Sequence, residues 1–304
     1  MKLEINHIVK TFGNKEVLRD ISIKAESGKA HGLLGRNGAG KTTTMRIIMD
    51  IFPPDSGEIL LDGKPLKHSE IQIGYLPEER GMYPKITILN QLIYLGCLRG
   101  MSSKDAKAAA IRNLERLGME EYQSKKLQTL SKGNQQKIQL AATIMCNPKI
   151  VILDEPFSGL DPVNAALLKD VVKDMVKQGA VVLFSSHQMN YIEEFCDTIS
   201  ILNGGQIAVD GRISEIKRSY PRNRLKISSR DCAKIQPFLL EKFSSEIQTL
   251  TEAENEDNAL IVTLNDEKYK SAVFHSLSGF DIDVFEVCEP SLSDIFVQYT
   301  EDKI

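Results

Sequence analysis

The sequence predicts an α/β core with an inserted helical subdomain, followed by a small α+β domain. Three observations lead to this prediction. A glycine-rich loop at residues 35–40 lies between an apolar run and a helical pattern. Two continuous apolar runs, Ile150–Leu153 and Val181–Phe184, are typical of strands that are buried on both faces of a parallel sheet. After about residue 222, strand and helix patterns follow one another in the order β-α-β-β-α-β, which favours a ferredoxin-like arrangement.

The glycine-rich loop reads G-x-x-x-x-G-K-T within HGLLGRNGAGKTTTMRIIMDIF. The run AHGLL before it predicts a strand, and the apolar residues after it recur at helical spacing. Glycines let the backbone wrap around phosphate oxygens, and the N–H groups of the loop and of the helix start attract anions. We expect Lys41 to reach terminal phosphates and Thr42 to hold Mg²⁺. A glycine-rich turn before a helix is the alternative. The expected phosphate contacts are Gly35, Arg36, Asn37, Gly38, Ala39, Gly40, Lys41, Thr42 and Thr43.

An acidic pair, Asp154 and Glu155, ends the apolar run in KIVILDEPFSGLD. Two acids at the carboxyl end of a buried strand are costly unless they bind something, and open α/β sheets bind ligands at that end. We expect Asp154 to hold Mg²⁺ through water. We expect Glu155 to be the base, or the orienting group, for a water that attacks a γ-phosphate. The alternative is that both acids only begin a turn at EPFSG.

A histidine, His187, follows the run Val181–Phe184 just beyond its end. The carboxyl ends of parallel strands share one edge of a sheet, so His187 is expected beside the acids and the phosphate loop. This position favours a contact with the γ-phosphate. A structural histidine is the alternative.

The segment at about 86–144 has apolar residues at helical spacing and a helix cap at Ser102 or Ser103. It contains LSKGNQQK, whose hydroxyl, cation and amides are suited to holding an anion. The alternative is an ordinary polar turn, in which Ser131 caps a helix that runs from Asn134. On either side of this segment, residues 1–84 and 145–215 are expected to alternate apolar strands with helices.

The phosphate loop, acidic pair and histidine, in this order, resemble the ATP-binding subunit of a bacterial ABC transporter. The resemblance covers about residues 1–215 and implies a P-loop ATPase core with ATP and Mg²⁺ as cofactors. LSKGN resembles the ABC signature LSGGQ, with Lys132 in place of the first glycine and Asn134 in place of the glutamine. In this family the signature caps the ATP of a second subunit, so Ser131 and Gly133 are expected to donate to that γ-phosphate. Lys132 faces either the same phosphates or solvent.

Two further positions follow from the resemblance. SGLD, at residues 158–161, resembles the D-loop that crosses the dimer interface, which makes Asp161 part of the expected nucleotide site. Phe12 lies where the family stacks an aromatic ring on adenine; a core or turn residue is the alternative.

Glu78, in YLPEERGMYPKIT, stands where the family usually has a glutamine that senses Mg²⁺ and the attacking water. A glutamate ligates Mg²⁺ but cannot donate hydrogen bonds as an amide does. We therefore expect Glu78 to sense the γ-phosphate or Mg²⁺. Nearby, Met82, Tyr83 and Ile86 either line the groove where this family docks membrane subunits or serve ordinary packing.

The bulk composition narrows the class of protein. The 304 residues are 42% hydrophobic and 26% charged, as in soluble globular proteins. A net charge of -3 gives no indication of nucleic acid as a partner. The five cysteines are scattered without a CxxC pair, which favours reduced thiols inside a cell. No secretory signal and no membrane span is expected, so any link to a membrane would pass through a partner or a surface.

The resemblance implies an ATPase domain at 1–217, with the helical subdomain at about 86–144, and an accessory domain at 222–304 of a kind common in bacterial exporters. The chain would be the ATP-hydrolysing motor of an exporter on the cytoplasmic face of the cell membrane. Its partners would be a second ABC ATPase subunit, expected to be an identical copy, and separate membrane-spanning permease subunits.

The alternative is a non-transport ABC ATPase that acts on ribosomes or nucleic acid. Such members usually carry two ATPase halves or long coiled coils, which this sequence lacks. The final segment, EPSLSDIFVQYT, predicts a helix with one apolar face, formed by Leu292, Ile295, Phe296 and Tyr299.

Overall fold

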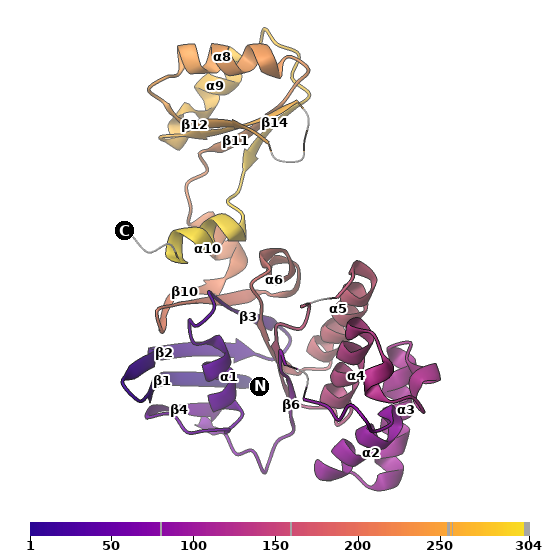
Figure 1. Ribbon diagram of the computed structural model, residues 1–304. Helices are drawn as coiled ribbons and strands as arrows, with labels where there is room; N and C mark the ends of the chain where they lie inside the picture. The colour runs from indigo at the N-terminus through magenta and orange to yellow at the C-terminus, as the bar shows by residue number, and fades with distance from the viewer. Residues whose placement is uncertain (80, 159, 254–255, 257, 301–304) are drawn as a thin grey trace. The chain divides into compact units, whose positions relative to one another are not determined.

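The computed structural model describes residues 1–79, 81–158, 160–253, 256 and 258–300 (Figure 1). The chain divides into two compact units. The first comprises Met1–Ile213 together with Gln298–Ile304, and the second comprises Ser214–Val297. The division expected from the sequence, 1–217 and 222–304, therefore differs from these units at both ends of the second one.

A six-stranded, mostly parallel sheet forms the centre of the first unit. Three of its strands are buried along their whole length, as their apolar sequences predicted. The edge strand β10 pairs antiparallel with β9, and the other pairs are parallel. In spatial order the strands are β10 (Gln206–Arg212), β9 (Thr198–Asn203), β3 (Ala30–Gly35), β8 (Val181–Ser185), β7 (Ile150–Asp154) and β6 (Ile73–Leu76).

A second, antiparallel sheet has the order β2-β1-β4-β5. Its strands are β1 (Lys2–Phe12), β2 (Lys15–Glu26), β4 (Ser56–Leu61) and β5 (Lys64–Pro65). The expected alternation of strands with helices is wrong here, because β1 and β2 form a hairpin. Gly13, at φ 58°, supplies the left-handed conformation that this tight turn requires. Alternate residues of β1 and β2 are buried, so these strands do not read as continuous apolar runs.

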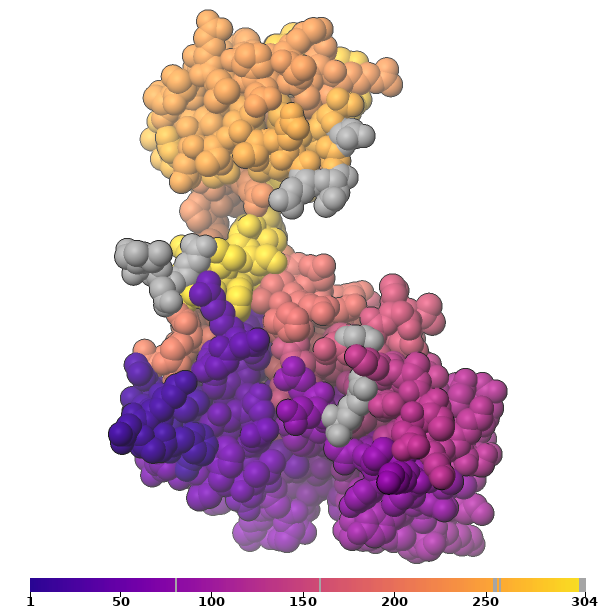
Figure 2. Space-filling view, viewed as in Figure 1, coloured from indigo at the N-terminus to yellow at the C-terminus, as the bar shows by residue number. Residues whose placement is uncertain are grey.

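The predicted helical subdomain consists of α2 (Ile88–Leu98), α3 (Ser103–Arg116) and α4 (Lys132–Ile144), with two short 3₁₀ turns before α4. In the space-filling view it forms a lobe of the first unit, on the side away from the antiparallel sheet (Figure 2). Ser102 is the N-cap of α3, because its hydroxyl accepts from the Asp105 N–H at 3.1 Å. Ser131 caps α4 in the same way, and the helix begins at Lys132 rather than at Asn134.

Three further helices belong to the first unit: α1 (Lys41–Ile48), α5 (Pro162–Lys177) and α6 (Met189–Phe195). α1 packs against β3 and β7, which places its N-terminus at the carboxyl edge of the parallel sheet. Across the described residues, no helix combines the length and apolar character that a membrane span needs.

The second unit has the predicted β-α-β-β-α-β order, and its sheet order β12-β13-β11-β14 confirms the ferredoxin-like arrangement. Both helices pack on one face of the sheet around a core that includes Leu225, Leu239, Val262 and Val273. Its elements are β11 (Arg224–Ser228), α8 (Cys232–Lys242), β12 (Ile247–Glu252), β13 (Ala259–Leu264), α9 (Lys270–Ser276) and β14 (Val284–Cys288). Glu254, at the end of the expected strand IQTLTEAE, lies outside the described residues.

Two short helices lie next to the boundaries between the units: α7 (Ile213–Arg218) and α10 (Leu292–Thr300). Of the predicted apolar face of α10, Leu292 and Ile295 are fully buried, whereas Tyr299 is exposed.

Candidate functional site

The phosphate loop connects β3 to α1, and two of its glycines are required by close contacts. A Cβ atom on Gly35 would lie 2.7 Å from the carbonyl oxygen of Leu202. Gly40 has φ 115°, and a Cβ there would lie 2.5 Å from Leu18 Cδ2. The Gly35 contact is with rigid backbone, and Gly40 has a positive φ that L side chains rarely adopt, so glycine at both positions lets the loop turn tightly into the helix.

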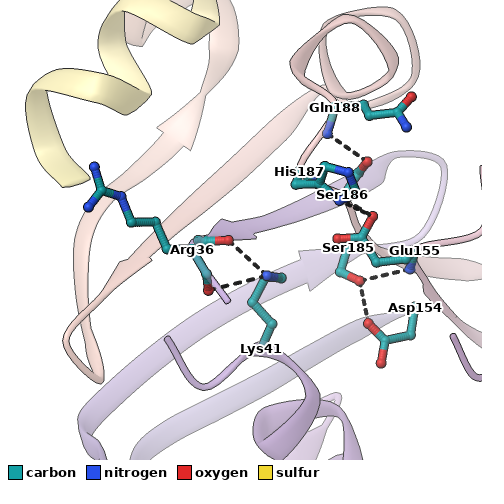
Figure 3. Close-up of polar contacts among 9 residues, drawn as sticks. Arg36, Lys41, Asp154, Glu155, Ser185, Ser186, His187 and Gln188 are labelled. Carbon is teal, nitrogen blue, oxygen red and sulfur yellow. Dashed lines mark hydrogen bonds and ion pairs between the residues drawn. The ribbon is translucent and has the colours of Figure 1, made fainter. Parts of the chain in front are cut away.

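Lys41, the first residue of α1, is buried, and its ammonium group lies inside the loop. Nζ donates to the carbonyl oxygens of Gly35 at 2.8 Å and of Arg36 at 3.5 Å (Figure 3). A lysine ammonium group held only by carbonyl oxygens is free to exchange these partners for a stronger acceptor. Phosphate oxygens are such acceptors.

Asp154 ends β7, and the residue is only 2% exposed. The Ser185 hydroxyl, at the end of the neighbouring strand β8, donates to Oδ1 at 2.6 Å. The Tyr75 side chain of β6 and the Arg46 side chain of α1 lie close to Asp154. Burial raises the pKa of Tyr75 to about 12, with the charge of Asp154 adding to the rise. Tyr75 therefore stays neutral at physiological pH and adds no second negative charge beside Asp154.

Glu155 follows in a sharply turned conformation with φ 48°, a region that residues other than glycine seldom adopt. Its N–H donates to the carbonyl oxygen of Ser185 at 3.2 Å and to the hydroxyl of Ser185 at 3.1 Å. Ser185 thus holds both acids: it bonds the carboxylate of Asp154 and the backbone N–H of Glu155 (Figure 3).

The Glu155 carboxylate meets His187 across the sheet edge. Oε2 lies 2.9 Å from Nδ1 of His187 and 3.4 Å from its backbone N–H. The glutamate side chain is 7% exposed, whereas the histidine side chain is 59% exposed. The structure therefore joins two predicted site residues into one pair, in which a buried carboxylate is presented beside an accessible imidazole.

Aromatic packing fixes the backbone on both sides of this pair. Phe157, two residues after Glu155, is stacked on Tyr191 of α6 at a ring distance of 4.1 Å. It also packs against Phe184 and Phe195. The turn that carries Glu155 and the helix that follows His187 are therefore packed together by rings that are largely out of water.

The strand order explains why the predicted residues meet. β3, β8, β7 and β6 are consecutive parallel strands, and their carboxyl ends lead to the phosphate loop, His187, the acidic pair and Glu78 in that order. Glu78 lies two residues beyond β6 and is exposed. We refer to this group, residues 35–43 with Glu78, Asp154, Glu155 and His187, as the strand-end site.

A separate surface gathers the other predicted residues. Ser131 Oγ accepts from the N–H of Asn134 at 3.3 Å, and a Cβ on Gly133 would lie 3.3 Å from the Asn164 side chain. The Asn164 N–H in turn donates to Asp161 Oδ1 at 2.9 Å and lowers the pKa of Asp161. We call Ser131, Gly133 and Asp161 the signature surface. Within the described part of the chain, no hydrogen bond or ion pair joins it to the phosphate loop. Gly159 of the expected D-loop lies outside the described residues.

Phe12 ends β1, and its ring is 46% exposed. It packs edge-to-face on Phe52, with ring centres 5.3 Å apart, and the Lys10 ammonium lies 5.5 Å from its centre. An exposed, supported ring is compatible with stacking on a base, and it rules out the alternative of a core residue for Phe12.

The donor set at the sheet edge fits Mg²⁺. This ion is usually held by one or two carboxylates together with phosphate oxygens, and not by a cage of protein ligands. Asp154 supplies a buried carboxylate, and Thr42 follows Lys41 on the helix that packs against β7. No group of three or more histidine, cysteine or acidic residues suited to a metal occurs among the residues that the structure describes.

Comparison with known proteins gives consistent results. Residues 18–158 match the family described as ABC transporter, and residues 211–300 match the family described as ATP-binding protein DrrA1-3-like, C-terminal domain. An uncharacterized ABC transporter ATP-binding protein, YhaQ of Bacillus subtilis (strain 168), is 40% identical over 97% of both chains. The linearmycin resistance ATP-binding protein LnrL of the same organism is 34% identical over 70% of both chains.

Among solved structures, an ATP binding subunit of an ABC transporter superimposes with a TM-score of 0.66 at 28% identity, covering 72% of this chain and 93% of that one. The phosphate loop, the strand order and the similarity to a relative over nearly the full length all indicate the same family. The chain therefore belongs to the family of ABC transporter ATP-binding proteins.

Proposed function

We propose that this chain is the ATP-hydrolysing motor subunit of an ABC exporter. The observation that carries the proposal is the strand-end site, where one sheet edge gathers a phosphate loop, a buried aspartate and a paired glutamate and histidine. This set contains a group for each task of phosphoryl transfer to water: phosphate binding, metal binding and orientation of the nucleophile.

Each residue of the strand-end site has a distinct role in this proposal. Loop N–H groups and Lys41 bind the β- and γ-phosphates. Thr42 and Asp154 hold Mg²⁺, which neutralises charge on the phosphates, with Glu78 as a further ligand or sensor. The Glu155 carboxylate orients a water and takes its proton, while His187 keeps that carboxylate in place and reaches the γ-phosphate.

The proposal assigns the signature surface to the nucleotide of a second subunit, which we take to be an identical copy. Ser131 and the Gly133 N–H lie at the N-terminus of α4, where the helix dipole favours an anion. Asp161 caps the neighbouring helix α5. A head-to-tail pair would set this surface over the partner's phosphate loop, so that each ATP touches both chains.

A permease contact is supported by exposed apolar side chains beside the helical subdomain. Tyr83 and Ile86 are 48% and 41% exposed, and Tyr83 lies edge-on to Tyr94 of α2 at 6.3 Å. Exposed aromatic and aliphatic side chains that lie together mark surfaces for protein partners. We propose that this surface docks the membrane-spanning subunits and holds the chain at the cytoplasmic face of the membrane.

Outward transport is the direction we propose. Its support is the match of the second unit to the DrrA1-3-like C-terminal domain and the similarity to an ATP-binding protein named for linearmycin resistance. Resistance to a compound is readily explained by pumping it out. The transported compound meets the permease and not this chain.

The test is to tag the chain in its native cell, solubilise membranes gently and identify what is purified with it. A multi-spanning membrane protein at a fixed ratio is the expected result. Ribosomes or nucleic acid in its place would contradict the transport proposal and favour a non-transport ABC ATPase. ATP hydrolysis by the purified chain tests the motor independently of the partner.

A further inference from the structure

The loop after β6 carries Glu78, and its backbone is held by one side chain of another element. Gln139 of α4 donates from Nε2 to the carbonyl oxygen of Pro77 at 3.4 Å and to that of Glu79 at 3.3 Å. Among the described residues, no other hydrogen bond to the backbone of Pro77–Glu79 occurs. The backbone on both sides of Glu78 is thus tied to a single amide group.

Gln139 is suited to this task by its chemistry and its burial. A glutamine amide has two N–H donors, one for each carbonyl that flanks Glu78. Gln139 as a whole is 5% exposed, so these donors have little access to water as an alternative partner. Pro77 has no N–H of its own, which leaves the loop few ways to form regular hydrogen bonds. Both facts make the Gln139 contact the main constraint on the direction of the Glu78 backbone.

The same face of α4 holds two other parts of the sheet edge. Gln136 Nε2 donates to the carbonyl oxygen of Pro156 at 3.3 Å, directly after Glu155. The Thr143 hydroxyl shares its one proton between the carbonyl oxygen of Gln139 at 2.9 Å and that of Tyr75 in β6 at 3.2 Å. Positions 136, 139 and 143 lie along one side of a helix. α4 therefore runs beside the strand-end site and contacts backbone next to both of its glutamates.

We propose that Gln139 is a positioning residue that sets Glu78 for hydrolysis and links it to the signature end of α4. Ser131 and Gln139 are eight residues apart, which is about 12 Å along a helix. A shift of α4 on binding a partner's nucleotide then moves the carbonyls that flank Glu78 in the chain's own site. This inference rests on the proposed function, because it assumes that Glu78 acts on the γ-phosphate or Mg²⁺.

The test compares Gln139→Met, which keeps the length but loses both donors, with Gln139→Glu, which places carboxylate oxygens against the two carbonyls. The control is Thr143→Val, four residues further along the same helix, which removes a hydroxyl that donates to the backbone of Tyr75 and Gln139 and leaves the Gln139 side chain in place. We expect Gln139→Met to lower kcat for ATP hydrolysis about 10-fold, with KM for ATP changed less than about 2-fold. Gln139→Glu should be slower still, and Thr143→Val should stay near the wild-type rate.

The decisive readout repeats Gln139→Met in a Glu78→Ala background. If Gln139 acts through Glu78, the second substitution has little further effect, because coupled residues are not additive. Three results would each overturn the inference. The first is an undiminished 10-fold effect of Gln139→Met in the Glu78→Ala background, and the second is a wild-type kcat for both Gln139 variants. The third is loss of nucleotide binding along with hydrolysis. A wild-type chain without ATP hydrolysis would instead contradict the proposed function.

Discussion

The strand-end site and the signature surface contain similar chemical groups but present them in opposite ways. At the strand ends, Asp154 and Glu155 are almost fully buried, and Ser185 holds both of them. On the signature surface, Ser131 and Asp161 are exposed helix caps. The first arrangement fixes its groups within one chain. The second arrangement leaves the N-termini of α4 and α5 exposed to solvent.

This difference indicates what each region needs in order to act. Buried carboxylates are costly to leave without partners, so the strand-end site must be built during folding. An exposed helix N-terminus costs little and gains when an anion arrives. Changes at the strand ends should therefore alter binding or chemistry in a single chain, whereas changes on the signature surface should appear only when two chains meet.

The largest effect is expected for Glu155→Gln. The amide keeps the shape but cannot accept the proton of the attacking water, so hydrolysis should fall about 1,000-fold while ATP still binds. Phosphate release measures the first effect, and size-exclusion chromatography with MgATP should show a trapped dimer. Wild-type turnover in this variant would refute the assignment of Glu155 as the base.

Acid should weaken the core beneath the phosphate loop. His31 of β3 is buried, with Nδ1 2.9 Å from Thr198 Oγ and Nε2 2.9 Å from Ser200 Oγ, and Ser200 in turn donates to Asp210. Burial lowers the pKa of His31 to about 4, with Asp210 opposing the change. Between about pH 6.5 and pH 4 the unfolded chain takes up a proton that the folded chain refuses. Above pH 6.5 the neutral His31 does not reduce the free energy of unfolding. As pH falls from 6.5 to 4, the free energy of unfolding decreases by about 3 kcal/mol.

Urea unfolding of the wild type and of His31→Gln across this pH range tests the prediction. In His31→Gln, the loss of unfolding free energy that His31 causes between pH 6.5 and pH 4 should be absent. His275→Gln, which changes an exposed histidine on α9, is the control and should keep it. Equal pH dependence in the wild type and His31→Gln would show that His31 is not the responsible group.

Lys41→Ala should weaken nucleotide binding by about 2 kcal/mol, or roughly 30-fold, because charge-assisted hydrogen bonds to phosphate are lost. Titration of a single-chain preparation with a fluorescent ATP analogue measures it. Lys29→Ala, which removes a partly exposed lysine paired with Glu26, serves as the control. Unchanged affinity in Lys41→Ala would place the phosphates elsewhere.

The smallest effect on a single chain is expected for Ser131→Ala. Loss of the N-cap should cost about 1 kcal/mol of stability, with nucleotide binding to the monomer unchanged. Hydrolysis by the assembled pair should still fall, about 10-fold. Ser102→Ala removes the matching cap of α3 and should cost similar stability without the loss of hydrolysis. If Ser131→Ala abolished binding to the monomer, the separation between the two regions would fail.

Much of the fold was predictable because buried parallel strands read as apolar runs. Ile150–Leu153 and Val181–Phe184 were predicted in this way, and both are buried strands. The β1–β2 hairpin was missed, because its apolar residues alternate with polar ones and no run marks it. The ferredoxin-like order of the second unit was predictable from its short strands and helices.

The predicted site residues were those whose type suits phosphate or metal chemistry. Ser185, Tyr75 and Gln139 were not predicted, because each is a polar residue within an apolar element whose partner comes from another strand or helix. Their polarity inside buried elements is a signal, since buried polar groups need partners. The identity of those partners depends on strand order, which the sequence alone does not supply.

The most direct measurement of the central claim mixes two impaired variants. A chain with Lys41→Ala keeps its signature surface, and a chain with Ser131→Ala keeps its phosphate loop. If each nucleotide lies between two chains, mixed dimers contain one intact site, and an equal mixture should regain about a quarter of wild-type hydrolysis. No recovery, from chains shown to form mixed dimers, would mean that Lys41 and Ser131 serve the same nucleotide within one chain and would contradict the account.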